Sequence, residues 1–318
     1  MKYRKLGKTG FEVSVLSFGA SSLGSVFRET DDKESIRTVH TALDAGINLI
    51  DVSPYYGLKK AEIVLGKALK SVSRDRYYLS TKAGRYGADV FDFRSETIMA
   101  SVEESLQRLH TDYLDILFLH DIEFVEPSII YEEAIPALQR LKAEGKIRHT
   151  GICGLPLGLF EEFLPHAELD AIISYCHYSL NDTTLERLLP LIEDKQIGLV
   201  NASPLSMGLL GTRGTPDWHP ASTEVKEVCK QAAEYCAAQG EDIAKLAVQF
   251  STRNERIPTT LVSTANPSNI MKNALWVDEP INVQLLEEVR QRLKPILDET
   301  WNSGIPLYNR RVDRGEAK

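Results

Sequence analysis

The chain has 318 residues. A typical domain has ~100–200 residues, so one large domain or two ordinary ones would fit. Hydrophobic residues make up 43% and charged residues 26%, a globular balance that excludes a disordered or fibrous chain. The formal net charge of −8 argues against a nucleic acid or an anionic membrane as a partner bound through bulk charge. A local basic pocket for a phosphate remains compatible with this charge.

The expected compartment follows from what the sequence lacks. No apolar run approaches the ~18 residues of a membrane helix, and the basic start MKYRKLGKTG has no apolar segment behind it. The four cysteines form no CxxC pair and no Cys/His cluster with zinc spacing. Sparse cysteine in a chain of this length fits a reducing compartment. We therefore predict a cytoplasmic protein without a disulfide, a structural zinc or another metal.

In chain order, short apolar runs alternate with longer amphipathic stretches. The runs are apolar almost throughout, which is typical of parallel strands covered on both faces. Several of the longer stretches carry helix signals, such as Asp31 at a start and Gly46 or Gly145 at an end. Strands are expected at 13–19, 48–52, 77–82, 114–120, 148–153, 170–175, 197–202 and 259–264, and helices at 31–46, 95–109, 129–145, 157–164, 184–195, 224–239, 242–253, 267–275 and 282–297.

This alternation predicts one (β/α)8 TIM barrel, a single domain over residues 1–318, because no linker divides the chain into halves. Such a barrel needs ~250 residues. The surplus is expected in a small β-hairpin at 1–12, a long loop at 203–223, and an extra helix with a tail at 276–318. The two common nucleotide fingerprints, GxGxxG after a strand and GxxxxGK[ST], are absent.

Polar residues at three successive strand ends carry the chemical prediction. Asp51 ends the second strand and is followed by Tyr56, Lys82 ends the third, and His120 ends the fourth. Barrel active sites lie at this end of the strands. A neighbouring ammonium favours the phenolate of a tyrosine, so Lys82, held by Asp51, could tune Tyr56 for proton transfer, with His120 orienting the reacting oxygen. Taken singly, each residue also fits a structural role, as a cap, a turn aromatic, a rim charge or a core histidine.

The segments LDAGINLIDVSPYYG, STKAG and DYLDILFLHD, in this order and spacing, resemble the aldo-keto reductases over nearly the whole chain. The resemblance implies a (β/α)8 barrel, a nicotinamide cofactor and a catalytic tetrad of Asp51, Tyr56, Lys82 and His120. Within that family, the loop segments HDIEF, SYCHYSLND, NASPLSMGLL, DWHPAS and TWNSGI resemble the aldose 1-dehydrogenases that act on L-galactose or L-fucose.

The sequence departs from the general family pattern at the nicotinamide end. Cys153 and Gly154 stand where the family usually has Ser-Asn, the expected Gln falls at or near Tyr175, and Ala202 replaces a stacking aromatic. The resemblance implies that Ala265 stands where NADP-binding relatives carry a cation, which favours NAD over NADP. The cofactor residues expected on this basis are Gly19, Ala20, Ser21, Asp51, Tyr175, Ser203, Leu205, Gly208, Ser263, Ala265, Ser268, Asn269 and Asn273.

The resemblance implies NAD-dependent oxidation of an aldose at C1, such as L-galactose, to its lactone. The expected substrate contacts are Tyr56, Tyr86, His120, Asp121, Trp218 and His219. A small-molecule sugar is the expected partner, and a monomer or weak homo-oligomer the expected assembly. Alternatives are an NADPH-dependent aldehyde or ketone reductase of the same family, and a barrel that binds nucleotide without turnover. A metal-dependent sugar isomerase would need further carboxylates at strand ends, where the chain has Cys153, Tyr175, Ala202 and Thr264.

Overall fold

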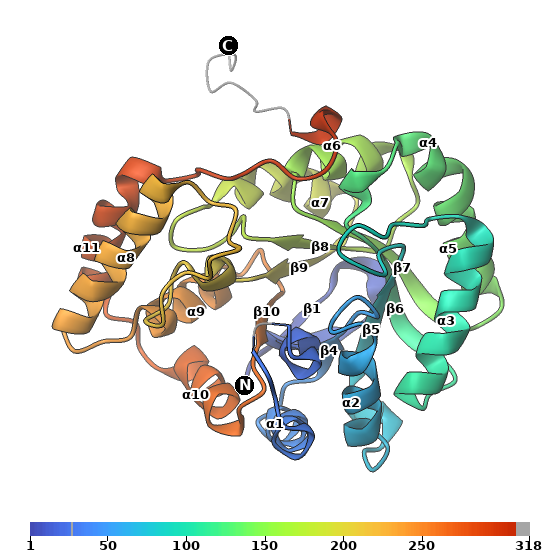
Figure 1. Ribbon diagram of the computed structural model, residues 1–318, viewed down its shortest axis with the longest axis horizontal. Helices are drawn as coiled ribbons and strands as arrows, with labels where there is room; N and C mark the ends of the chain where they lie inside the picture. Colours follow the sequence, from blue (N-terminus) through green and yellow to red (C-terminus); the bar gives the residue numbers. More distant parts are fainter. Residues whose placement is uncertain (27, 310–318) are drawn as a thin grey trace.

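The computed structural model describes residues 1–26 and 28–309. Eight parallel strands close into a barrel, each hydrogen-bonded to its two neighbours. Helices surround the barrel in Figure 1, so the predicted TIM barrel is confirmed. In order around the barrel, the strands are β10 (Thr259–Ser263), β3 (Leu16–Gly19), β4 (Leu49–Asp51), β5 (Tyr78–Ala83), β6 (Leu114–His120), β7 (Ile147–Gly154), β8 (Ala171–Tyr175) and β9 (Gly198–Ala202).

The predicted hairpin exists, but its second strand was misplaced. Strands β1 (Tyr3–Lys5) and β2 (Glu12–Ser14) pair antiparallel, so the run expected as one strand at 13–19 is divided between the hairpin and barrel strand β3. Leu6, Phe11 and Val13 of the hairpin are buried in the same cluster as barrel-interior residues such as Phe118. The hairpin therefore fills the end of the barrel opposite the carboxyl ends of the strands.

Most of the helix ranges expected from the sequence are confirmed within a few residues. Helix α2 was not expected, and the predicted helix at 129–145 is built of α4, a π-helical turn at Ile130–Ala134 and α5. The α-helices are α1 (Asp32–Asp44), α2 (Lys60–Leu69), α3 (Ser95–Leu109), α4 (Pro127–Ile129), α5 (Ile135–Ala143), α6 (Leu157–His166), α7 (Leu189–Asp194), α8 (Thr223–Ala238), α9 (Ile243–Arg253), α10 (Pro267–Asp278) and α11 (Val283–Leu293).

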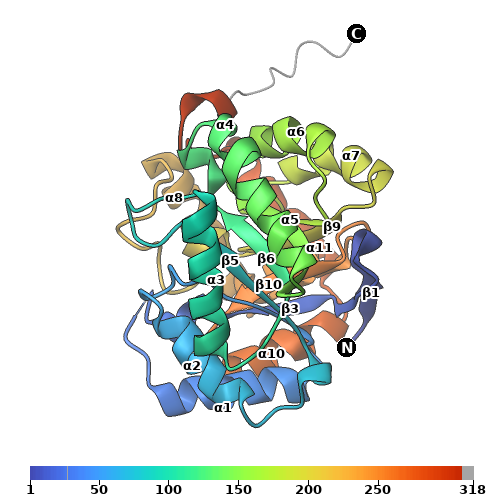
Figure 2. The same cartoon turned by 90° about the vertical axis from the view of Figure 1, so that its right-hand side faces the viewer.

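Two layers of apolar packing hold the barrel. One fills its interior, and a larger one lies between the strands and the helices outside them. Helices α2, α3 and α5 stand side by side along one flank in Figure 2. A further cluster joins α8, α9 and the predicted extra helix α11. The helices thus cover the sides of the barrel, and the loops after the strands surround its carboxyl end.

Two further sequence predictions can be compared with the structure. All four cysteines are free and buried. Among the described residues, no helix is both long and apolar enough to cross a membrane. Phe27 and residues 310–318 of the predicted tail lie outside the described residues.

Candidate active site

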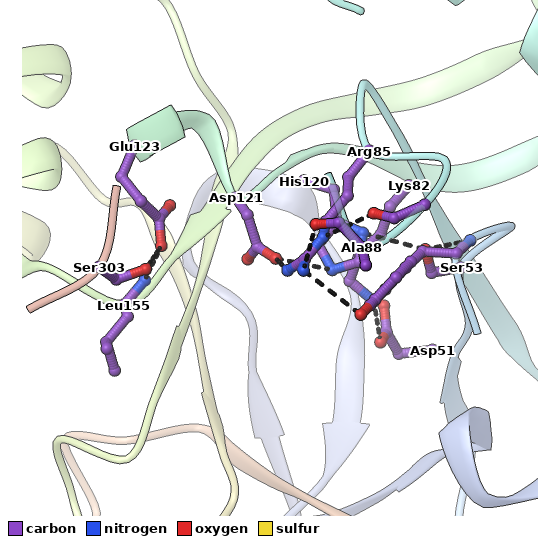
Figure 3. Close-up of polar contacts among 12 residues, drawn as sticks. Asp51, Ser53, Lys82, Arg85, Ala88, His120, Asp121, Glu123, Leu155 and Ser303 are labelled. Carbon is purple, nitrogen blue, oxygen red and sulfur yellow. Dashed lines mark hydrogen bonds and ion pairs between the residues drawn. The ribbon is translucent and has the colours of Figure 1, made fainter. Parts of the chain in front are cut away.

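The four predicted catalytic residues come together at the carboxyl end of the barrel. Asp51, Lys82 and His120 lie on the neighbouring strands β4, β5 and β6, and each is at least 95% buried. Lys82 donates hydrogen bonds to the Asp51 carboxylate and, at 3.0 Å, to the carbonyl of Val52. Figure 3 shows these side chains converging. The structure thus forms the Lys82–Asp51 ion pair that the sequence pattern suggested.

Tyr56 is placed by a close approach of two glycines. The backbone of Gly57 has φ +61°, and a Cβ there would lie 2.0 Å from the carbonyl oxygen of Gly24. A side chain at either glycine would push the two loops apart, so these positions need glycine. The contact fixes the turn that carries Tyr56, whose ring centroid lies 4.9 Å from the Lys82 ammonium.

The expected effect of Lys82 on Tyr56 is present but does not prevail in the protein alone. Burial raises the pKa of the Tyr56 phenol above its ordinary value, Lys82 acts to lower it, and Asp51 raises it further. The pKa of Lys82 is also raised: burial acts to lower it, but the charge and hydrogen bond of Asp51, together with Tyr56 and Cys153, outweigh burial. The resting site therefore holds a neutral phenol beside a protonated lysine.

His120 is oriented by a residue that the sequence analysis did not single out. Its Nδ1 shares a hydrogen bond of 3.0 Å with the Ser53 hydroxyl, which leaves Nε2 for the site. The imidazole ring stands edge-on to Tyr56, with 5.6 Å between ring centroids. Burial and the nearby charges of Lys82 and Arg85 hold the pKa of His120 well below its usual value. A neutral imidazole can therefore donate from Nε2 to an oxygen beside Tyr56.

Arg85 and Asp121 form a second ion pair in the site. Arg85 Nη1 lies 2.5 Å from Asp121 Oδ2, and Asp121 is 3% exposed. Burial raises the pKa of Asp121, whereas Arg85 and the Tyr175 hydroxyl act to lower it. Sequence reasoning proposed Asp121 but missed Arg85, although it follows the strand-end lysine in STKAGR. Figure 3 shows the side chains of Arg85 and Asp121 pointing toward one another, close to His120.

Glu123, two residues beyond Asp121, is fully buried and was also missed. Its Oε1 accepts hydrogen bonds from the Leu155 amide at 3.1 Å and from the Ser303 hydroxyl at 2.9 Å. Burial and the charge of Asp121 raise the pKa of Glu123 to about 8. At neutral pH this carboxyl is therefore uncharged, and it joins the C-terminal segment to the loop after β6.

The residues expected at the adenosine end of a cofactor lie after β3 and β10. Ser21 Oγ donates to Ser263 Oγ at 2.9 Å, and the amide and hydroxyl of Ser22 bond the same oxygen. Ser22 is a member of this hydroxyl cluster that the sequence analysis did not name. The other expected positions here are Gly19 and Ala20, which begin this turn, Ala265, which is buried, and Ser268, Asn269 and Asn273, which lie in α10.

The segment after β9 contains three of the expected cofactor residues, Ser203, Leu205 and Gly208. It turns tightly, with positive φ at Ser203, Ser206, Met207 and Gly208. The amides of Ser206 and Gly208 already donate within the turn, to the carbonyls of Ser203 and Leu205. Tyr175 lies at the end of the adjacent strand β8 and is partly exposed. The turn thus has the curvature of an anion-binding site, although some of its backbone amides already donate hydrogen bonds within the turn.

The predicted substrate residues lie in different surroundings. His219 is buried, and both ring nitrogens bond its own loop, Nε2 to the Ser206 carbonyl and Nδ1 to the Ala221 amide. Trp218 beside it is 53% exposed. Tyr86 is partly buried, and its hydroxyl lies near Ser101 of α3. Tyr56, His120 and Asp121 lie together, whereas Tyr86 and His219 make contacts that support loops.

Three possible metal ligands lie close together within this site. Ligand atoms of His120, Asp121 and Cys153 are within 4.8 Å of one another. The Lys82 ammonium and the Arg85 guanidinium are close enough to perturb the ionisation of this group, and Arg85 already pairs with Asp121. These two positive charges disfavour a cation at this position, since like charges repel strongly in a buried site.

Comparison with known proteins decides the family. The sequence pattern of the Aldo/keto reductase family matches residues 15–293. The chain belongs to the aldo-keto reductases. Members of this family are oxidoreductases that use NAD or NADP, so this chain is an oxidoreductase.

Similar proteins in this family include sugar dehydrogenases. The chain is 46% identical to the L-galactose dehydrogenase of Arabidopsis thaliana, over 96% of this chain and 98% of that protein. It is 36% identical to the D-arabinose 1-dehydrogenase of Saccharomyces cerevisiae, over 92% and 95% respectively. A holo-form aldo-keto reductase from Bacillus halodurans has the same fold, with a TM-score of 0.78 and 27% identity over 98% of this chain and 100% of that one.

Proposed function

We propose that this aldo-keto reductase oxidises an aldose at C1, with L-galactose or a closely similar sugar as substrate and NAD as cofactor. The observation that carries the proposal is the assembled Asp51, Tyr56, Lys82 and His120 cluster. It occurs in a chain 46% identical, over nearly its full length, to a protein named L-galactose dehydrogenase.

The proposed chemistry follows from the protonation states of the cluster. Tyr56 first gives its phenol proton to solvent, and Lys82 stabilises the phenolate so formed. The phenolate oxygen then takes the proton of the anomeric hydroxyl. Asp51 holds the lysine in place through its ion pair. Neutral His120 donates from Nε2 to the same sugar oxygen and orients it. When bound, a nicotinamide dinucleotide supplies the hydride acceptor for C1.

The donor groups at the strand ends fit such a dinucleotide. The hydroxyls of Ser21, Ser22 and Ser263 suit sugar and phosphate oxygens, and the turn over Ser203 to Gly208 has the curvature of an anion site. By resemblance, the adenosine ribose is expected next to the segment after β10. Asn266 there donates to the Glu34 carboxylate at 2.8 Å. A negative charge at this place and the buried Ala265 both favour NAD over the extra phosphate of NADP.

The test is a panel of initial rates with NAD and NADP. L-Galactose and L-fucose should be oxidised much better than D-galactose or D-glucose, since a pocket that hydrogen-bonds individual hydroxyls rejects misplaced ones. The ratio kcat/KM should favour NAD. A preference for NADP of about tenfold, which corresponds to ~1.4 kcal/mol, would contradict the cofactor proposal. Activity confined to simple aldehydes with NADPH would instead favour a reductase of the same family.

A further inference from the structure

Among the described residues, one carboxylate oxygen of Asp121 makes no hydrogen bond of normal geometry. The residue follows His120 directly and has a left-handed backbone, with φ 53°. Its Oδ2 accepts from Arg85, whereas Oδ1 is buried and makes no hydrogen bond of normal geometry among the described residues. The Tyr175 hydroxyl lies near enough to the carboxylate to lower its pKa. Because an unpaired buried polar atom is costly, such an atom in an active site points to a missing ligand.

A second buried aspartate on the same strand provides the comparison. Asp115, near the opposite end of β6, also pairs with an arginine, Arg74, at 2.5 Å. Both carboxylate oxygens of Asp115 accept hydrogen bonds. Oδ2 also accepts one from the Leu79 amide, and Oδ1 accepts one from Arg148 at 3.1 Å. At the structural end of the barrel the carboxylate is thus fully paired, and at the catalytic end it is not.

Arg85 fixes the direction in which this oxygen points. Its guanidinium lies over the Tyr55 ring, 4.1 Å from the centroid, and donates to the Tyr55 hydroxyl at 3.3 Å. It also donates to the carbonyls of Gly87 and Ala88, both at 3.3 Å. The arginine is therefore held from several sides, and its ion pair with Oδ2 restrains the orientation of the Asp121 carboxylate.

The position relative to His120 indicates which substrate group would meet it. Asp121 Oδ2 lies 3.6 Å from His120 Nε2. This distance is too long for a direct hydrogen bond, but it is short enough for two oxygens on neighbouring substrate carbons to contact the two side chains. An oxygen held by Nε2 is therefore adjacent to the Asp121 carboxylate. In a vicinal diol, the neighbouring oxygen lies about one hydrogen-bond length away. A hydroxyl on the next carbon can thus donate to Oδ1.

We propose that Asp121 accepts a hydrogen bond from the sugar hydroxyl next to the reacting carbon, and that Arg85 is its positioning residue. The inference rests on the proposed function and narrows its substrate class to cyclic aldoses with a free 2-hydroxyl. Sugars without that hydroxyl, and simple alcohols or aldehydes, leave Oδ1 unpaired and are rejected.

The first test compares L-galactose with 2-deoxy-L-galactose on the unmodified protein with NAD. A site that pairs a substrate hydroxyl rejects the analogue lacking it by large factors, so kcat/KM should fall on the order of 10²-fold or more for the deoxy sugar. Oxidation of both sugars with similar kcat/KM would overturn this inference alone. If neither sugar is oxidised, the proposed function fails, and the inference fails with it.

Variants then test whether Asp121 and Arg85 cause the discrimination between L-galactose and 2-deoxy-L-galactose. Asp121→Ala should lower kcat/KM for L-galactose far more than for the deoxy sugar, so that their ratio approaches one. Arg85→Lys should retain more of the wild-type ratio of kcat/KM between the two sugars than Arg85→Met does, because a lysine can keep the ion pair with Asp121. Asp115→Asn breaks the matched pair at the other end of β6 and should leave the ratio unchanged. Each variant's fold is checked by circular dichroism, with Asp121→Asn as the milder substitution. A ratio that stays large in both Asp121 variants would contradict the role of this residue.

Discussion

At the scale of single residues, Tyr56, the proposed proton acceptor, shows how burial and a neighbouring charge act in opposite directions on the pKa of one group. Burial keeps its phenol neutral in the protein alone, although a lysine lies beside it. The proton of the substrate can move to Tyr56 only after the phenol has ionised, so oxidation should become faster as the pH rises above neutrality. The strand-end pattern predicted the partners of Tyr56, but the balance between burial and charge required the structure.

Replacing Tyr56 by Phe removes the proton acceptor and keeps the ring. Because general acid–base catalysis typically contributes ~10²–10⁴-fold, kcat for sugar oxidation should fall by about that factor, with NADH affinity by fluorescence titration little changed. Tyr78→Phe is the matched control, since Tyr78 stacks on Phe11 at the far end of the barrel. Near-normal turnover by Tyr56→Phe would assign the proton transfer to another group.

Glu123 predicts a pH dependence of stability. Its pKa is raised to about 8 in the folded protein, against about 4.3 when unfolded, so folding favours its protonated form. The stabilisation is complete below the unfolded pKa and is lost as the pH rises toward 8. In urea unfolding, wild type should lose stability relative to Glu123→Gln by up to ~1.4 kcal/mol per pH unit in this window, with no further change above it.

The control for Glu123 is a glutamate shifted in the opposite direction. Hydrogen bonds from Lys59 and Arg108 lower the pKa of Glu104. Wild type should therefore lose stability relative to Glu104→Gln as the pH falls, not as it rises. A pH-independent difference between wild type and Glu123→Gln would show that the carboxyl is not held in its protonated form.

At the scale of elements, the strands were predictable because parallel barrel strands are apolar throughout. Helix α2 was missed, although KAEIVLGKAL is apolar enough for a helix. It contains Gly66, and glycine has a low helix propensity. The structure gives the reason for this glycine. A Cβ at Gly66 would lie 2.0 Å from the Arg108 carbonyl oxygen of α3, so the two helices pack at backbone distance.

Gly66→Ala therefore tests the contact between α2 and α3. Alanine improves helix propensity, but overpacking at backbone distance typically costs ~1–3 kcal/mol, so the free energy of unfolding in urea should fall. Lys67→Ala, one residue along, should change it by less than ~1 kcal/mol, because Lys67 makes only an exposed ion pair with Asp32. An equal or higher stability of Gly66→Ala would show that the helices can separate without loss.

The loop after β9 gives a second prediction at this scale. His219 was predicted to contact substrate, but its ring joins the Ser206 carbonyl to the Ala221 amide within the loop. His219→Ala should therefore raise the Kd for NAD several-fold by loosening the turn at 203–208. Trp218→Ala, which removes a side chain that is 53% exposed, should raise the KM for sugar instead. Both constants can be measured by cofactor titration and initial rates, and an unchanged Kd in His219→Ala would contradict the supporting role.

The residues that sequence reasoning missed share one property: they act through partners distant in the chain. Ser53 bonds His120, Arg85 pairs with Asp121, and Glu123 bonds Ser303. Each is an ordinary loop residue until the barrel closes, since no local periodicity marks such contacts. The four tetrad positions, by contrast, lie at or just after strand ends, which the apolar runs already locate.

At the scale of the whole molecule, the barrel places the proposed proton-transfer groups and the predicted cofactor residues on different strands of the same rim. Strands β4, β5 and β6 are neighbours both in the chain and in the barrel, so the proton-transfer groups converge at one side of its mouth. Strands β3, β9 and β10 are neighbours on the other side, and most of the predicted cofactor residues lie at or after their ends. A dinucleotide bound across β3, β9 and β10 would thus meet a sugar held over β4 to β6.

The central claim is that a hydride leaves C1 of an aldose for the nicotinamide. The most direct measurement uses L-galactose with deuterium at C1 and follows the reduced cofactor by mass spectrometry. The proposed reaction predicts one deuterium in each NADH formed, with a C1 lactone as the other product. NADH without deuterium, or no NADH from the sugar while simple aldehydes are reduced with NADPH, would contradict it.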